Sequence, residues 1–169
     1  ALAPVAEELK IPTFFTEGCG DLLFETAVPN PHYCFASNNI LSADGVSSAI
    51  VVANTWPQVR KIAHLHPDYA FGRYMFAHFN VAIEKLLPRV QVISEGWPKL
   101  GERDFTAQIT KIIAAKPDLL VTSLWGGDYV AFYKQAVGQG LFGKMKVCAS
   151  TALAIAPQAL GKDHPEGIV

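Results

Sequence analysis

The chain has 169 residues, of which half are apolar and 17% are charged, and its formal net charge is −1. This length and composition are typical of one ordinary globular domain. The near-neutral charge, without any basic cluster, excludes nucleic acid as an expected partner. The longest apolar runs are far shorter than the roughly 20 residues that span a bilayer, so we expect no membrane insertion.

The first ten residues carry Glu7 and Glu8 and lack the basic start of a signal peptide. We therefore expect the chain to begin after processing or within a fold. The three cysteines form no CxxC pair, and only Cys19 and Cys34 lie close in sequence. Their spacing favours free thiols over a bridge between them.

In chain order, apolar patterns and turn residues predict alternating strands and helices. The expected strands cover residues 11–16, 33–37, 60–66, 90–95, 119–124 and 146–149, and a further strand begins at 167. The expected helices cover residues 4–9, 42–55, 74–87, 105–116, 128–138 and 152–160. We expect Ser42 or Asp44 to cap the second helix and Asp104 to cap the fourth.

Periodicity also predicts which side chains are buried. Apolar residues recur at helical spacing in the helices that begin near residues 74, 105 and 128. The strand at residues 119–124 is almost continuously apolar, which is typical of a strand covered on both faces. Strands that alternate with helices predict βαβ units with right-handed crossovers. The fold class is therefore α/β, a Rossmann-like lobe with a mostly parallel sheet flanked by helices.

In such sheets, ligands bind at the carboxyl ends of the strands. Here those ends are the loops at 67–72, 96–101, 125–128 and 150–152. Tyr69, Phe71 and Trp125 lie in two of these loops, and large aromatics there suit ligand stacking better than phosphate binding. The alternative to ligand contact is different for each residue. Phe71 and Trp125 would instead be buried in the core, and Tyr69 would be a surface residue.

Enzyme motifs are missing from the sequence. There is no GxSxG elbow, P-loop or HExxH motif, and the glycines at 138 and 140 follow a helix instead of a strand. His64 and His66 stand two apart on a strand, with Asp68 near, as a metal pair would. We prefer structural roles for both histidines and expect no metal, no cofactor and no enzymatic activity.

Several short motifs, in their order, resemble one known family. They are Asp-Tyr-Ala-Phe-Gly at 68–72, Gly-Glu-Arg-Asp-Phe at 101–105, Pro-Asp at 117–118, Gln-Ala at 135–136 with Gly-Leu at 140–141, and Glu-Gly-Ile-Val at 166–169. Together they resemble the branched-chain amino-acid type of periplasmic solute-binding protein (type I) of ABC transporters. The resemblance spans the whole chain, and the order and spacing of the motifs carry it.

That resemblance implies two Rossmann-like lobes with a ligand trapped between them. Residues 1–36 would be the end of the first lobe with the hinge crossover, and residues 37–169 the second lobe, ending at the hinge. Because family chains are much longer, the chain would be a fragment. The strand at residues 11–15 would then lack its usual sheet neighbours.

The resemblance also implies site residues. The segment 17–19 matches the first-lobe loop that holds a ligand carboxylate, Phe71 and Trp125 match two aromatics of the second lobe, and Ser150 or Thr151 falls near an acidic residue that pairs with a ligand ammonium. The residues expected to bind ligand are Glu17, Gly18, Cys19, Tyr69, Phe71, Trp125, Ser150 and Thr151.

The implied function is a periplasmic or extracellular solute-binding component that delivers a small carboxylate-bearing ligand to a membrane permease. A neutral hydroxyl at Ser150 or Thr151 is a poor partner for a buried ammonium. Phe71 and Trp125 therefore favour an aromatic acid over leucine or valine. The alternative function is a ligand-sensing domain of a receptor or regulator with the same fold.

Overall fold

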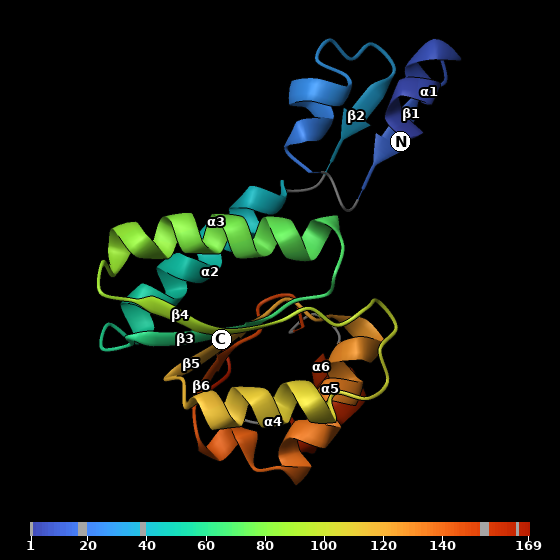
Figure 1. Ribbon diagram of the computed structural model, residues 1–169. Coiled ribbons are helices and arrows are strands. Elements are labelled where there is room, and N and C mark those ends of the chain that lie inside the picture. The colour runs from blue at the N-terminus through green and yellow to red at the C-terminus, as the bar shows by residue number, and fades with distance from the viewer. Residues whose placement is uncertain (1, 17–19, 38–39, 153–155, 165) are drawn as a thin grey trace.

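The computed structural model describes residues 2–16, 20–37, 40–152, 156–164 and 166–169 (Figure 1). The strands are β1 (Thr13–Phe15), β2 (Cys34–Ala36), β3 (Lys61–Leu65), β4 (Gln91–Gly96), β5 (Leu119–Thr122) and β6 (Lys146–Cys148). The α-helices are α1 (Leu2–Glu8), α2 (Leu41–Thr55), α3 (Ala70–Leu86), α4 (Thr106–Ala115), α5 (Gly126–Gly138) and α6 (Ala156–Leu160). None of the helices described is long and apolar enough to cross a membrane.

The main unit is built on a four-stranded sheet with the order β4-β3-β5-β6, and every pairing in it is parallel. Helices α2 and α3 cover one face of this sheet, and α4, α5 and α6 lie on the other face (Figure 1). This arrangement confirms the predicted α/β fold with a parallel sheet between helices. Because consecutive βαβ units pack this way, the carboxyl ends of all four strands lie along one edge.

Each face of the sheet has its own core. On the α2/α3 side, Val52, Phe79 and Ile83 pack against Ile62 and Leu119. On the other side, the predicted stripes of α4 and α5 pack on the opposite face of the strands. The buried residues of that second core include Leu65, Phe105, Ile109, Ile112, Leu120, Tyr129, Phe132 and Ala136. All four residues of β5 are buried, as its apolar run predicted.

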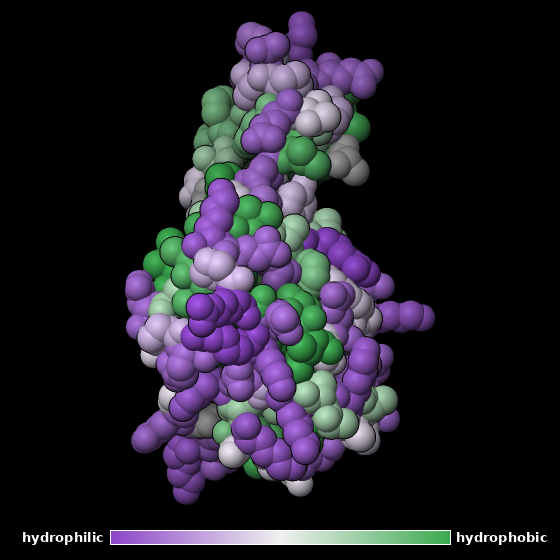
Figure 2. All heavy atoms as spheres, turned by 60° about the vertical axis from the view of Figure 1, so that its left-hand side comes forward, coloured by the Kyte–Doolittle hydropathy of each residue, from purple (hydrophilic) through white to green (hydrophobic). Residues whose placement is uncertain are grey.

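A second, smaller unit contains α1, β1 and β2 and projects from the main unit (Figures 1 and 2). Its two strands form a separate parallel sheet. The rings of Phe14 and Phe35 stack with their centroids 5.1 Å apart, and both side chains are exposed. This two-stranded sheet agrees with the expectation that the strand at residues 11–15 lacks further neighbours, whereas the division into lobes at residue 36 stays a prediction.

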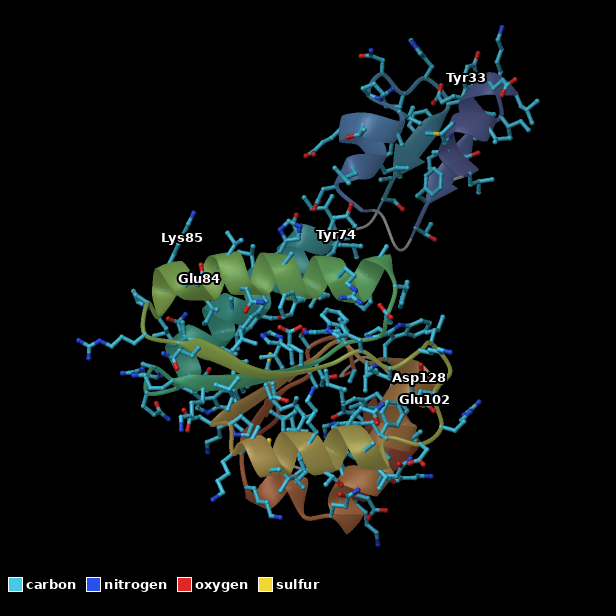
Figure 3. The ribbon with its side chains drawn as sticks, viewed as in Figure 1. Tyr33, Tyr74, Glu84, Lys85, Glu102 and Asp128 are labelled. Atoms are coloured by element: carbon cyan, nitrogen blue, oxygen red, sulfur yellow. The ribbon has the colours of Figure 1, made fainter. Side chains whose placement is uncertain are left out.

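One contact region joins the two units. The carboxylate of Asp21 accepts a hydrogen bond from the Ser42 hydroxyl at 2.9 Å, and its other oxygen lies 3.3 Å from Nε2 of His78 on α3. Tyr74, on the side of α3 that faces the small unit (Figure 3), stacks on the His78 ring. The prediction that Ser42 or Asp44 caps α2 is wrong: the N-cap is Ile40, because the helix begins at Leu41 and both residues lie within its first turn.

Other boundaries also differ from the predictions. Helix α3 begins at Ala70, four residues before the predicted start, so Phe71 belongs to its first turn. A π-helical turn at Leu23–Ala27 has no counterpart among the predicted elements. The prediction that Asp104 is the N-cap of α4 is wrong by one residue: the N-cap is Phe105, and the Asp104 carboxylate just before it accepts a hydrogen bond from the Thr106 N–H at 2.9 Å. Cys34 is a free thiol in contact with the Ala3 carbonyl, whereas Cys19 lies outside the described residues.

Candidate functional site

Two aromatic residues stand at the carboxyl ends of neighbouring strands. Tyr69 is the N-cap of α3 and follows β3, and Trp125 is the N-cap of α5 and follows β5. Both have extended backbone dihedral angles, with φ of −152° and −139°. Because β3 and β5 are adjacent parallel strands, the two residues come together at the edge where ligands bind in such sheets.

The two side chains are in direct contact. The indole Nε1–H of Trp125 donates a hydrogen bond of 3.0 Å to the hydroxyl oxygen of Tyr69. Trp125 is 44% exposed and Tyr69 is 37% exposed, so a core position for Trp125 is excluded. The half-buried ring of Phe71 lies 6.0 Å from the Tyr69 ring. We call Tyr69, Phe71 and Trp125 the aromatic cluster.

The surroundings of Tyr69 raise the pKa of its phenol, chiefly through burial. Partial burial raises the pKa of Tyr69, the nearby Asp128 carboxylate raises it further, and the Trp125 hydrogen bond acts in the opposite direction. Asp128, in the first turn of α5, accepts a hydrogen bond of 2.8 Å from the Gly101 N–H. This bond ties the loop after β4 to α5, and Figure 3 shows Asp128 beside Glu102 of that loop. The cluster therefore offers ring faces and a phenol O–H donor.

Beneath the aromatic cluster lies a chain of buried polar groups. Nδ1 of His64 is 2.9 Å from Nε2 of His66, and Nδ1 of His66 is 2.7 Å from Oγ of Ser123. All three side chains are fully buried, and the His64 ring packs edge-on against Phe76 and Phe79. We call these three residues the His64–His66–Ser123 chain.

Asp68 does not join the two histidines. Its carboxylate forms an ion pair with Arg73 on the exposed surface. The three side chains that a metal would need are therefore not assembled, and both histidines are instead held by neighbouring rings and by Ser123.

We expect the buried histidines to make the protein acid-sensitive. Burial lowers the pKa of His64 from 6.5 to about 3, and burial, aided by the charges of His64 and Arg73, lowers the pKa of His66 well below 6.5. Below pH 6.5 the unfolded chain therefore binds protons that the folded chain does not, and stability falls as the pH falls. At pH 5 the loss is about 2 kcal/mol for His64, and His66 adds a loss of the same sign.

Urea denaturation at pH 7 and pH 5 measures this loss. A double variant His64→Phe with His66→Leu should show a smaller difference between the two pH values, because it lacks both titrating groups. The variant His32→Gln, which removes an exposed histidine, serves as the control and should keep the full difference. An unchanged pH dependence in the double variant would contradict the assignment.

The other expected site residues follow the end of β6 or lie outside the described residues. Ser150 follows β6 and is exposed, and its hydroxyl shares a hydrogen bond of 2.9 Å with the Ser48 hydroxyl of α2. Oγ1 of Thr151 is buried and has no hydrogen-bond partner among the described residues. The segment 17–19, with Glu17, Gly18 and Cys19, lies outside the described residues.

Two residues near the site were not singled out from the sequence. The guanidinium of Arg73 lies 3.6 Å from the centre of the Trp97 ring, and that ring packs against His66 and Phe76. Trp97 directly follows β4, so its place at a strand end was a usable signal. Arg73 lies in the first turns of α3, and only the earlier start of that helix brings it to the same edge.

The comparisons with known proteins show one matching family model and solved structures of the same fold. The sequence model of the family described as periplasmic binding protein matches residues 1–169. The comparison with curated proteins found no match.

Three solved structures illustrate the similarity. A solute-binding protein of an ABC transporter from R. palustris, in complex with benzoate, is 18% identical with a TM-score of 0.82, over 96% of this chain and 43% of that one. An ABC transporter substrate-binding protein from Sphaerobacter thermophilus is 20% identical with a TM-score of 0.76, over 96% and 44%. A putative branched-chain amino acid ABC transporter protein from Rhodospirillum rubrum is 17% identical with a TM-score of 0.71, over 98% and 45%. The TM-scores show a shared fold, and this chain spans less than half the length of each structure.

Proposed function

Because this chain belongs to the periplasmic binding protein family, we propose that it is part of the extracytoplasmic solute-binding component of an ABC transporter. In this proposal the protein binds a small carboxylate-bearing ligand between two lobes and delivers it to a membrane permease. The ligand is released unchanged, so the protein is not an enzyme. The observation that carries the proposal is the exposed aromatic cluster at the carboxyl ends of β3 and β5.

The arrangement of the two units supports a division into lobes. Residues 1–36 would be the end of the first lobe and the hinge crossover, and residues 37–169 the second lobe. The exposed Phe14–Phe35 stack gives the small sheet an apolar face of the kind that packs inside a larger sheet. In this proposal the segment 17–19, which lies outside the described residues, would supply the first-lobe ligand contacts.

The chemistry of the aromatic cluster favours an aromatic acid. Tyr69, Phe71 and Trp125 offer ring faces for stacking, and a neutral phenol donates to an acceptor such as a carboxylate oxygen. Ser150 and Thr151 offer hydroxyls where an ammonium would need an anion. Benzoate, which is bound in one of the structures of the same fold, is therefore the first ligand to test, and leucine is the comparison.

The test is calorimetric titration of the complete protein, containing both lobes, with benzoate, 4-hydroxybenzoate and leucine. We expect benzoate or 4-hydroxybenzoate to bind with micromolar or tighter affinity and leucine to bind at least tenfold more weakly. Tight leucine binding without any binding of the aromatic acids would overturn the ligand class. Ligand recovered in altered form would overturn the assignment as a binding protein.

The alternative is a ligand-sensing domain of a receptor or regulator, which uses the same fold. It shares the site, so ligand affinity does not separate the two functions. Reconstitution with the membrane permease of an ABC transporter does separate them, since only a transport component stimulates uptake of the bound ligand.

A further inference from the structure

The hydrogen-bond ladder between β3 and β5 stops just below the aromatic cluster. The last residues paired in it are Leu65 and Thr122. One residue farther along each strand, the backbone ladder is replaced by a side-chain bond of 2.7 Å between Nδ1 of His66 and Oγ of Ser123. This bond thus holds the two strand ends together where the backbone no longer does.

His66 also contacts the carboxyl end of a further strand, β4. Its backbone N–H donates a hydrogen bond of 3.1 Å to the Gly96 carbonyl at the end of β4, and its ring packs against Trp97. On its far side the ring bonds to His64 at 2.9 Å. A single buried residue therefore connects the carboxyl ends of three neighbouring strands.

A contribution to stability alone does not explain why the His64–His66–Ser123 chain is present. Burying hydrogen-bonded polar groups gains little over apolar side chains of the same shape, and replacing both partners of such a bond is often nearly neutral. The two bonds of the chain, His64 to His66 at 2.9 Å and His66 to Ser123 at 2.7 Å, do define one geometry, because hydrogen bonds are short and directional. The geometry in question is the spacing of the strand ends, since Ser123 is two residues before Trp125 and His66 three before Tyr69.

We propose that His66 and Ser123 are positioning residues for the ligand site, and that their bond sets the separation of the β3 and β5 ends at which Tyr69 and Trp125 meet. This inference rests on the proposed function for its effect on ligand affinity. Its geometric part, the contact between the Tyr69 hydroxyl and the Trp125 indole, is independent of any ligand.

The test compares three variants of the complete protein. Ser123→Ala removes one partner of the bond, and the double variant His66→Leu with Ser123→Ala removes both. Ser94→Ala is the matched control, because Ser94 is a buried serine of the neighbouring strand β4 whose hydroxyl has no hydrogen-bond partner among the described residues. The readouts are the indole N–H resonance of Trp125, the crystal structure of each variant, urea denaturation and benzoate titration.

We expect Ser123→Ala and the double variant to shift the Trp125 resonance, to lengthen the Tyr69–Trp125 contact beyond hydrogen-bond range and to weaken benzoate binding at least tenfold. The double variant also leaves Nδ1 of buried His64 without its partner, so it should not regain the stability that Ser123→Ala loses, and its affinity should stay low. Ser94→Ala should change none of these. A stable double variant that keeps the 3.0 Å contact and binds benzoate normally would overturn the proposal. If the wild-type protein binds no aromatic acid, the proposed function fails, and the resonance and the crystal structures still decide the positioning role.

Discussion

Replacing Gly72 with alanine is expected to destabilise the protein by about 3 kcal/mol, the upper range for an overpacked buried site. Gly72 is buried in the first turn of α3, and a Cβ atom added there would lie 2.1 Å from the Pro67 carbonyl oxygen and 3.2 Å from Cβ of His66. Both are parts of the chain that cannot swing away. The helix and the loop that carries Tyr69 must therefore separate, so ligand binding should weaken as well. Urea denaturation and benzoate titration measure the two effects.

Gly127→Ala is the matched control for this prediction. Gly127 occupies the corresponding first turn of α5, and a Cβ atom added there meets nothing within 4 Å. Alanine is a better helix former than glycine, so stability should stay the same or rise by up to about 1 kcal/mol. Equal effects of the two substitutions would show that the close approach at Pro67 does not restrict the residue at position 72.

Replacing Trp125 with alanine is expected to weaken binding of the aromatic acid about 30-fold, or about 2 kcal/mol, which is the usual effect of losing a central aromatic contact. The substitution removes a stacking face and also frees the Tyr69 hydroxyl that the indole N–H holds in place. Because Trp125 is 44% exposed, stability should change little. Calorimetry for affinity and urea denaturation for stability separate the two quantities.

The control for Trp125 lies on the same helix. Val137→Ala truncates a side chain that is 50% exposed near the far end of α5, and it should leave affinity unchanged. The conservative change Trp125→Phe keeps a ring and loses the N–H donor, so it should fall between the wild type and the alanine variant. Affinity that survives Trp125→Ala would remove this residue from the ligand site.

Much of the main unit was predictable from local patterns. The apolar stripes of α4 and α5 and the continuous apolar run of β5 were assigned correctly, because burial on one face repeats at the period of the element itself. The helix starts were less accurate. Helix α3 begins at Ala70, directly after its extended N-cap residue Tyr69, and its first turn holds a glycine that lowers the local helix propensity.

The sequence by itself determined the fold class, the family resemblance and the two aromatic strand ends, since all three depend on the order of residues along the chain. Only the tertiary structure decided that Tyr69 and Trp125 are in contact, because that contact follows from the adjacency of β3 and β5, whose order in the sheet is a property of the whole fold. The same holds for the bond between His66 and Ser123. His66 and Ser123 are 57 positions apart in the sequence and become partners only when the sheet assembles. No local sequence pattern predicts their hydrogen bond.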